Sequence, residues 1–239
     1  MKKIGGVRWY ILALIALGTV VNYIDRNALG ALAPVLRQEL QFSTEQYSFI
    51  VAAFQVCYSL MQPVAGFVMD FVGLRFGYAL FAFLWGLAGI LHAFAGGWQS
   101  MAFFRGLLGV SEAAAIPAGA KTASLWFPIG ERSIATGWFT TGTSIGAMIA
   151  PPLVIWLSLT WGWREAFVVT GLMGVGVSLL WLWLYRNPSE HKRLTPEEHA
   201  YITDGQADTI LPAPSMSKVL RLRKFWGIAV ARFLTEPAW

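Results

Sequence analysis

Residues 21–30 read VNYIDRNALG and place an acid and a base, Asp25 and Arg26, inside a long apolar run. The residues before this stretch are almost purely apolar, and the run continues through residues 28–36. A helix that spans a bilayer needs about 20 predominantly apolar residues, which this run supplies. The stretch therefore predicts a membrane helix that carries two charges in its interior.

The composition of the whole chain is that of a membrane protein. Of the 239 residues, 56% are hydrophobic and only 13% are charged, and the mean hydropathy is +0.54. Ordinary soluble domains carry about 25% charged residues. Apolar windows of span length lie at about 9–34, 46–69, 76–96, 98–119, 133–158 and 164–185, and a seventh begins near Phe225. We predict an all-α membrane protein with six spans and the start of a seventh.

The positions of the 18 basic residues predict the orientation of the chain. If the N-terminus is cytoplasmic, the outer loops hold only Arg37 and Arg164. The inner segments hold Lys2, Lys3, Arg8, Arg75, Lys121, Arg132, Arg186, Lys192, Arg193, Lys218, Arg221, Arg223 and Lys224. Cytoplasmic loops carry the excess of Lys and Arg, so this bias places the N-terminus in the cytoplasm. The net charge of +5 then reflects topology, and we expect no nucleic-acid partner.

Three segments follow from the windows: a six-helix bundle over 1–185, a charged cytoplasmic linker over 186–224, and the start of a seventh span over 225–239. Thr195-Pro196-Glu197-Glu198 combines a capping residue, proline at the first helical position and glutamate at the third. This pattern predicts a short helix from Pro196 to Gly205. We expect a looser piece over 211–215.

Four charged residues lie within the apolar spans of the predicted bundle: Asp25, Arg26, Arg105 and Glu112. An isolated charge in a bilayer is costly, so such residues are usually paired or face water, and they indicate a functional site. Asn22, Asp25 and Arg26 are three and four residues apart on one helix, and Arg105 and Glu112 are two turns apart on another. Two helices that each present an acid and a base to a common interior can couple proton movement to anion binding. The alternative is a structural ion-pair cluster that only fixes helix packing.

Polar side chains in the other spans could bind a hydroxylated anion beside these charges. Arginine holds a carboxylate well because its planar group donates two hydrogen bonds at once. Tyr23 and Tyr58 are the preferred partners for hydroxyl groups, and Thr143 is a further candidate. Threonine in a membrane helix often bonds back to its own backbone instead.

Residues 66–75, GFVMDFVGLR, resemble the loop between the second and third spans of the major facilitator superfamily, and the chain resembles the N-terminal half of such a transporter. It is most similar to the anion:cation symporter branch, and within it to bacterial hexuronate permeases. The likeness to the symporter branch lies in residues 22–27 (NYIDRN), 105–112 (RGLLGVSE) and 126–132 (WFPIGER). The likeness to hexuronate permeases lies in residues 8–10, 61–66, 145–152 and 231–239.

This resemblance implies a proton-coupled importer of galacturonate or glucuronate in the bacterial cytoplasmic membrane, working by alternating access. Asp25 and Glu112 would then carry protons, Arg26 would meet the sugar acid's carboxylate, and Arg105 would link to Glu112. Substrate contacts would come from Tyr23, Tyr58, Asn22 and Thr143, and the cytoplasmic gate from Asp70 and Arg75. An aldonate or aldarate such as galactonate or glucarate is the alternative substrate. No cofactor or metal is expected.

An intramembrane protease and a channel are the two remote alternatives for a six-span chain. Residues 142–146 (GTSIG) match the G-x-S-x-G nucleophile pattern of hydrolases, but that pattern needs a strand-turn-helix setting. A channel would need a re-entrant filter or a ring of acids, and the sequence shows neither. Superfamily members join two six-span halves, so we expect the chain to be a truncated N-terminal half that requires the missing C-terminal half.

Overall fold

The computed structural model describes residues 6–203, 218–219 and 221–235, and the chain divides into two units, Met1–Gln206 and Ala207–Trp239. Regular structure in the described residues is helical. In the first unit the α-helices are α1 (Val7–Glu39), α2 (Thr44–Val72), α3 (Leu74–Leu91), α4 (Trp98–Glu112), α5 (Ala115–Trp126), α6 (Arg132–Trp161), α7 (Trp163–Leu184) and α8 (Pro196–Thr203). The second unit holds α10 (Arg223–Thr235).

Among the residues that the structure describes, six helical segments are long and apolar enough to cross a membrane, as the sequence predicts. They are Val7–Glu39, Thr44–Val72, Leu74–Phe94, Trp98–Trp126, Ile129–Trp161 and Trp163–Leu184. The seventh predicted segment corresponds to α10, which begins two residues earlier than expected, and residues 236–239 lie outside the described part.

The fourth span is not the single helix that the sequence predicts over 98–119. It breaks at residues 113–114 into α4 and α5. Pro117 explains the break, because its ring clashes with the carbonyl four residues earlier and its nitrogen cannot donate a hydrogen bond. The helical ladder resumes where the Ala118 amide donates to the Ala114 carbonyl at 2.9 Å. Glu112 therefore lies at the end of α4, beside an interruption in the backbone.

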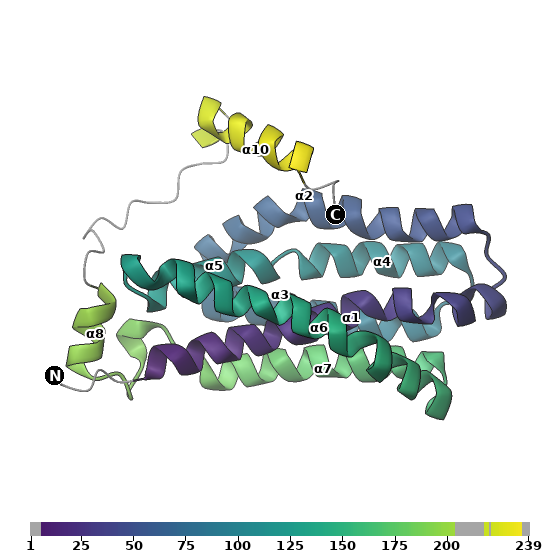
Figure 1. Cartoon of the computed structure of the whole chain (residues 1–239), viewed down its shortest axis with the longest axis horizontal. Coiled ribbons are helices and arrows are strands. Elements are labelled where there is room, and N and C mark those ends of the chain that lie inside the picture. Colours follow the sequence, from purple (N-terminus) through teal and green to yellow (C-terminus); the bar gives the residue numbers. More distant parts are fainter. Residues whose placement is uncertain (1–5, 204–217, 220, 236–239) are drawn as a thin grey trace. The chain divides into compact units, whose positions relative to one another are not determined.

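The bundle is built from long helices that lie side by side (Figure 1), with α1 packed on α6 and α7, α3 on α7, and α2 on α4. Glycine permits the closest of these contacts. A Cβ atom at Gly146 of α6 would lie 2.4 Å from the Val20 carbonyl of α1, and one at Gly171 of α7 would lie 2.5 Å from the Gly86 carbonyl of α3. Any side chain at these positions would force the helices apart.

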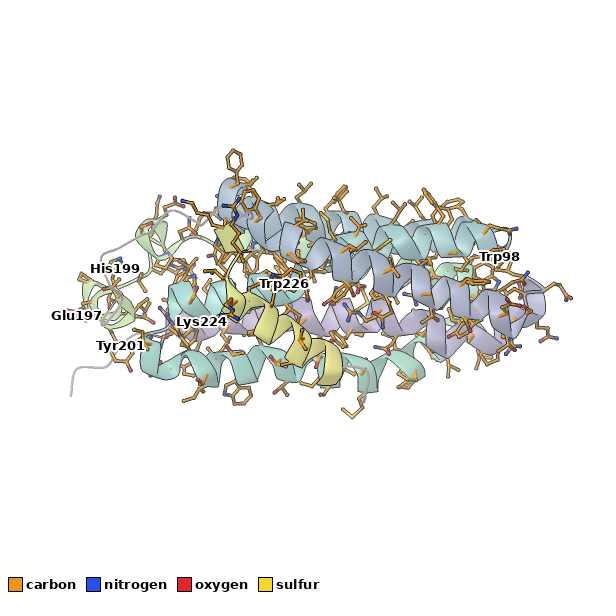
Figure 2. The ribbon with its side chains drawn as sticks, turned by 90° about the horizontal axis from the view of Figure 1, so that it is seen from above. Trp98, Glu197, His199, Tyr201, Lys224 and Trp226 are labelled. Atoms are coloured by element: carbon orange, nitrogen blue, oxygen red, sulfur yellow. The ribbon has the colours of Figure 1, made fainter. Side chains whose placement is uncertain are left out.

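The short helix α8 begins as the sequence predicts. The Thr195 hydroxyl accepts a hydrogen bond from the Glu198 amide at 3.2 Å, which caps the helix. The helix is described as far as Thr203, and both the predicted end at Gly205 and the looser piece over 211–215 lie outside the described residues. Figure 2 shows α8, with Glu197, His199 and Tyr201, at the end of the bundle opposite Trp98.

Glu198 joins α8 to the start of α1. Its fully buried carboxylate accepts hydrogen bonds from the Val7 amide at 3.4 Å and the Arg8 amide at 3.2 Å, and it lies 3.5 Å from the Arg8 guanidinium. The first amides of a helix have no partner within the helix and carry partial positive charge. Gly6 provides no side-chain cap for α1, so a residue 190 positions away supplies it.

Replacing Glu198 with alanine is expected to release α8 from α1. The change removes hydrogen bonds from two backbone amides to a charged group, each worth roughly 1.5–3 kcal/mol, while Arg8 keeps its ion pair with Glu131 at 3.3 Å. Amide hydrogen exchange over residues 196–203 should accelerate by about 30-fold, the rate change for a loss of about 2 kcal/mol. Glu197→Ala on the exposed side of the same helix is the control. Equal exchange rates in the two variants would contradict the role of Glu198.

Candidate functional site

Arg26 of α1 and Glu112 of α4 form an ion pair inside the bundle. The Arg26 Nε atom donates to the Glu112 Oε2 atom at 2.8 Å, and the Glu112 side chain is fully buried. Three aromatic rings surround the guanidinium: Tyr58 at 4.5 Å, Tyr23 at 4.7 Å and Phe54 at 5.0 Å. Arg26 Nη2 and Glu112 Oε1 are buried and have no hydrogen-bond partner among the described residues.

Arg105 lies beside this pair but bonds to a different atom than predicted. Its Nη2 atom donates to the Arg26 backbone carbonyl at 3.0 Å, and its guanidinium lies 5.5 Å from the centre of the Phe54 ring. The direct hydrogen bond to Glu112 comes from Arg26, while the charge of Arg105 still interacts with that of Glu112. Positions 105 and 112 are about 10 Å apart along the helix axis, so the two side chains meet α1 at different levels.

Asp25 bonds a different helix than the Arg26 pair does, while its charge still interacts with those of Glu112 and Arg105. Successive residues of an α-helix point about 100° apart. The Asp25 Oδ1 atom accepts a hydrogen bond from the Thr170 hydroxyl of α7 at 3.0 Å. Its Oδ2 atom faces α3, where a Cβ atom at Gly89 would lie only 2.7 Å away. Asp25 and Glu112 thus have different hydrogen-bond partners but lie within electrostatic range of each other.

Asn22 is fully buried on α1, three residues before Asp25 and four before Arg26. Neither atom of its side-chain amide has a hydrogen-bond partner among the described residues. Buried polar groups are normally paired, so an unpaired amide in the protein interior marks a place for a polar ligand or water.

A cavity of about 210 Å³ lies against the two guanidinium groups. It is lined by Arg26, Asn27, Leu29, Gly30, Tyr47, Val51, Phe54, Gln55 and Arg105. The sequence reasoning missed Tyr47 and Phe54. Tyr47, Phe54 and Tyr58 of α2 share a helical stripe, since residues spaced by three, four or seven lie on one face, and that spacing could have revealed them.

The remaining predicted side chains of the ligand site lie on α2 and α6. The Tyr58 hydroxyl accepts a hydrogen bond from the Gln62 amide at 3.3 Å. The Thr143 hydroxyl donates to the Thr140 carbonyl of its own helix at 2.8 Å, the back-bonding that the sequence left open as an alternative.

Asp70 and Arg75 flank the junction of α2 and α3 and contact different helices. Asp70 pairs with Lys121 of α5, and the Arg75 Nη2 atom donates to the Leu182 carbonyl of α7 at 2.7 Å. The Arg75 guanidinium also lies 5.2 Å from the centre of the Phe76 ring. The two residues tie this end of the junction to both sides of the bundle.

The sequence profile of the Major Facilitator Superfamily matches residues 15–236. The chain belongs to this superfamily. It is 49% identical over 243 residues to the galacturonate transporter of Dickeya chrysanthemi, and 50% identical over 243 residues to the hexuronate transporter of Escherichia coli (strain K12). Both comparisons cover the whole chain, which spans 70% and 56% of these relatives' lengths.

A superfamily member of known structure shares the fold. The bacterial homologue of the human lysosomal transporter Spinster, in an inward-facing and occupied conformation, superimposes with a TM-score of 0.70 and is 22% identical in sequence. The superposition covers 78% of this chain and 46% of the other. These comparisons confirm the predicted resemblance to the superfamily and the all-α membrane fold.

Proposed function

We propose that the protein imports a hexuronate anion, galacturonate or glucuronate, together with a proton. The observation that carries this proposal is the Arg26–Glu112 pair beside a cavity that Arg105 also lines. Its substrate class rests on the two relatives named for galacturonate and hexuronate transport. Aldonates and aldarates share the carboxylate and the hydroxyl groups, so they are the competing substrates in the test below.

Arg26 binds the ligand carboxylate in this proposal. Its Nε edge is occupied by Glu112, whereas Nη2 has a hydrogen still to donate, and the surrounding rings hold the guanidinium plane in place. Tyr23 and Tyr58, whose rings lie against the same guanidinium, supply hydroxyl contacts to the sugar ring in this proposal. Asn22 and Thr143 serve as further polar contacts.

Proton coupling follows from competition for the Arg26 guanidinium. When Arg26 turns toward a ligand carboxylate, Glu112 loses its counter-ion inside the bundle. A buried carboxylate without a counter-ion is costly and is stabilised by taking up a proton. Asp25, which has the Thr170 hydroxyl as its hydrogen-bonding partner, is the second proton carrier.

The cavity is smaller than the roughly 300 Å³ at the lower end of small-molecule sites, so we propose that a second six-helix bundle completes it. Residues 1–185 form the first bundle, 186–224 the cytoplasmic linker, and 225–239 the start of the seventh span. The N-terminus, Asp70 and Arg75 then face the cytoplasm of a bacterial cell, and the Asp70 and Arg75 contacts form the gate of that side.

The intact mass of the polypeptide in its native membrane tests whether the second bundle belongs to the same polypeptide. A species near 26.4 kDa would contradict a second bundle on the same chain.

Uptake by de-energised cells that make the protein from its own gene tests the proposed activity. Adding galacturonate or glucuronate should make the medium alkaline, because protons enter with the anion, and an uncoupler should abolish the change. Galactonate and glucarate, added in parallel, rank the competing substrate classes. Uptake of hexuronate without alkalinisation would contradict proton coupling, and a response only to galactonate or glucarate would contradict the substrate.

A further inference from the structure

A cavity of about 980 Å³ lies far from the charges of the candidate site and shares no lining residue with it. It is formed by the start of α1, the end of α7 and the segment that follows α7. The lining residues that matter for its chemistry are Tyr10, Trp183, Arg186, Glu190, Lys192 and Arg193.

Positive charge dominates this cavity. Arg186, Lys192 and Arg193 are three permanent cations, and Glu190 is the one carboxylate among its lining residues. Lys192 and Arg193 are exposed to solvent. The cavity is therefore suited to an anion.

The local backbone holds the Arg186 guanidinium in place and sets the positions of Lys192 and Arg193 along the chain. The Arg186 Nη1 atom donates to the carbonyls of Tyr185 at 2.7 Å and Leu182 at 2.9 Å, which fixes the guanidinium at the end of α7. The turn after it is closed by the Leu194 amide, which donates to the His191 carbonyl at 3.0 Å. This turn carries Lys192 and Arg193 at its corner.

His191 holds the turn as a neutral side chain. Its ring packs edge-on against Trp126 with ring centres 5.5 Å apart, and its Nδ1 atom accepts a hydrogen bond from the Arg193 amide at 3.3 Å. Burial, and after it the charge of Arg193, lower the pKa of His191 below its ordinary value. The ring therefore stays an acceptor at neutral pH and keeps the two cations together.

The mouth of the cavity carries aromatic side chains typical of a membrane interface. Tyr10 is 46% exposed and Trp183 is 74% exposed, and each lies near the end of a predicted span. Tyrosine and tryptophan concentrate where the hydrocarbon meets the lipid headgroups. The cavity thus combines cations with apolar rings at the depth where a lipid phosphate lies.

We propose that this cavity binds the headgroup phosphate of an anionic phospholipid of the phosphatidylglycerol class. The phosphate contacts Lys192, Arg193 and Arg186, and the acyl chains leave past Trp183 and Tyr10. Basic pockets between membrane helices bind anionic headgroups in this way. Phosphatidylethanolamine is disfavoured because its ammonium group enters a site that already holds three cations. The proposal does not depend on the transported substrate.

Lipid retention by the purified chain, measured by native mass spectrometry in neutral detergent, tests the proposal. Wild-type protein should retain phosphatidylglycerol in preference to phosphatidylethanolamine. The double variant Lys192→Gln/Arg193→Gln should lose about 30-fold in affinity for phosphatidylglycerol, since each basic residue near an anionic surface contributes about a factor of five. Glu190→Gln should raise the affinity by about fivefold, because it removes the opposing charge.

The matched control is Arg37→Gln/Arg164→Gln, which removes two exposed cations outside the cavity lining and should retain the lipid as wild type does. Equal retention of the two lipids, or unchanged affinity in the Lys192/Arg193 variant, would overturn the proposal. Displacement of phosphatidylglycerol by millimolar inorganic phosphate would assign the site to a soluble phosphate and overturn the lipid assignment. Unchanged melting temperatures verify that the variants are folded. Glu190→Gln adds a variant whose expected effect is a gain of affinity, which misfolding would not produce.

Discussion

Replacing Arg26 with lysine is expected to weaken galacturonate binding by about 100-fold although the positive charge is kept. A guanidinium can bond Glu112 through Nε while its Nη atoms donate to a carboxylate, whereas an ammonium group is a single point of charge on a flexible stem. Lysine also loses the planar stacking on Tyr23 and Tyr58. A loss of roughly 1.5–3 kcal/mol for one charge-assisted hydrogen bond corresponds to a factor of about 10 to 150.

Isothermal titration calorimetry of the protein purified from its native membrane measures this effect. Arg164→Lys is a matched control, because the Arg164 guanidinium also lies over an aromatic ring, 4.2 Å from the centre of Trp163, but is exposed and outside the cavity lining. Its affinity should stay within twofold of wild type, as expected for a surface substitution away from the site. Unchanged affinity in Arg26→Lys would remove Arg26 from the ligand site.

The spans and the charged residues of the site could be predicted from the sequence because both depend on local composition. An apolar window of about 20 residues and a charge within it can each be counted along the chain. The break between α4 and α5 could also have been predicted, since Pro117 acts on the carbonyl four residues before it. A hydropathy window marks the span, which is confirmed as Trp98–Trp126, but it carries no information on a break within it.

The partners of the buried charges could not be predicted, because they depend on helix rotation and on contacts far apart in the sequence. Asp25 and Arg26 are adjacent, yet one bonds Thr170 and the other Glu112. A turn of about 100° per residue gives the two adjacent side chains different hydrogen-bond partners, although the charge of Asp25 still interacts with that of Glu112. Glu198 is the clearest case: its local role at the start of α8 was predictable, but its bonds to the first amides of α1 were not.

Neutralising either buried acid is expected to abolish accumulation of hexuronate against a gradient. Asp25→Asn and Glu112→Gln should both still exchange labelled for unlabelled substrate, because exchange needs no net proton movement. The two variants should differ in binding. Glu112→Gln removes the counter-ion of Arg26 and should therefore strengthen anion binding, whereas Asp25→Asn leaves the Arg26–Glu112 pair intact and should keep the wild-type affinity.

Counterflow and energised uptake in the same membrane vesicles separate these outcomes. Glu165→Gln, which removes an exposed acid near the start of α7, is the control and should accumulate substrate as wild type does. If both Asp25→Asn and Glu112→Gln still concentrate hexuronate, protons are not carried by these acids. If only Glu112→Gln fails to accumulate hexuronate, Glu112 alone is sufficient for proton coupling. Asp25 then has a structural role between α1, α3 and α7. The geometry favours loss in both, because each acid is buried with an oxygen that has no partner among the described residues.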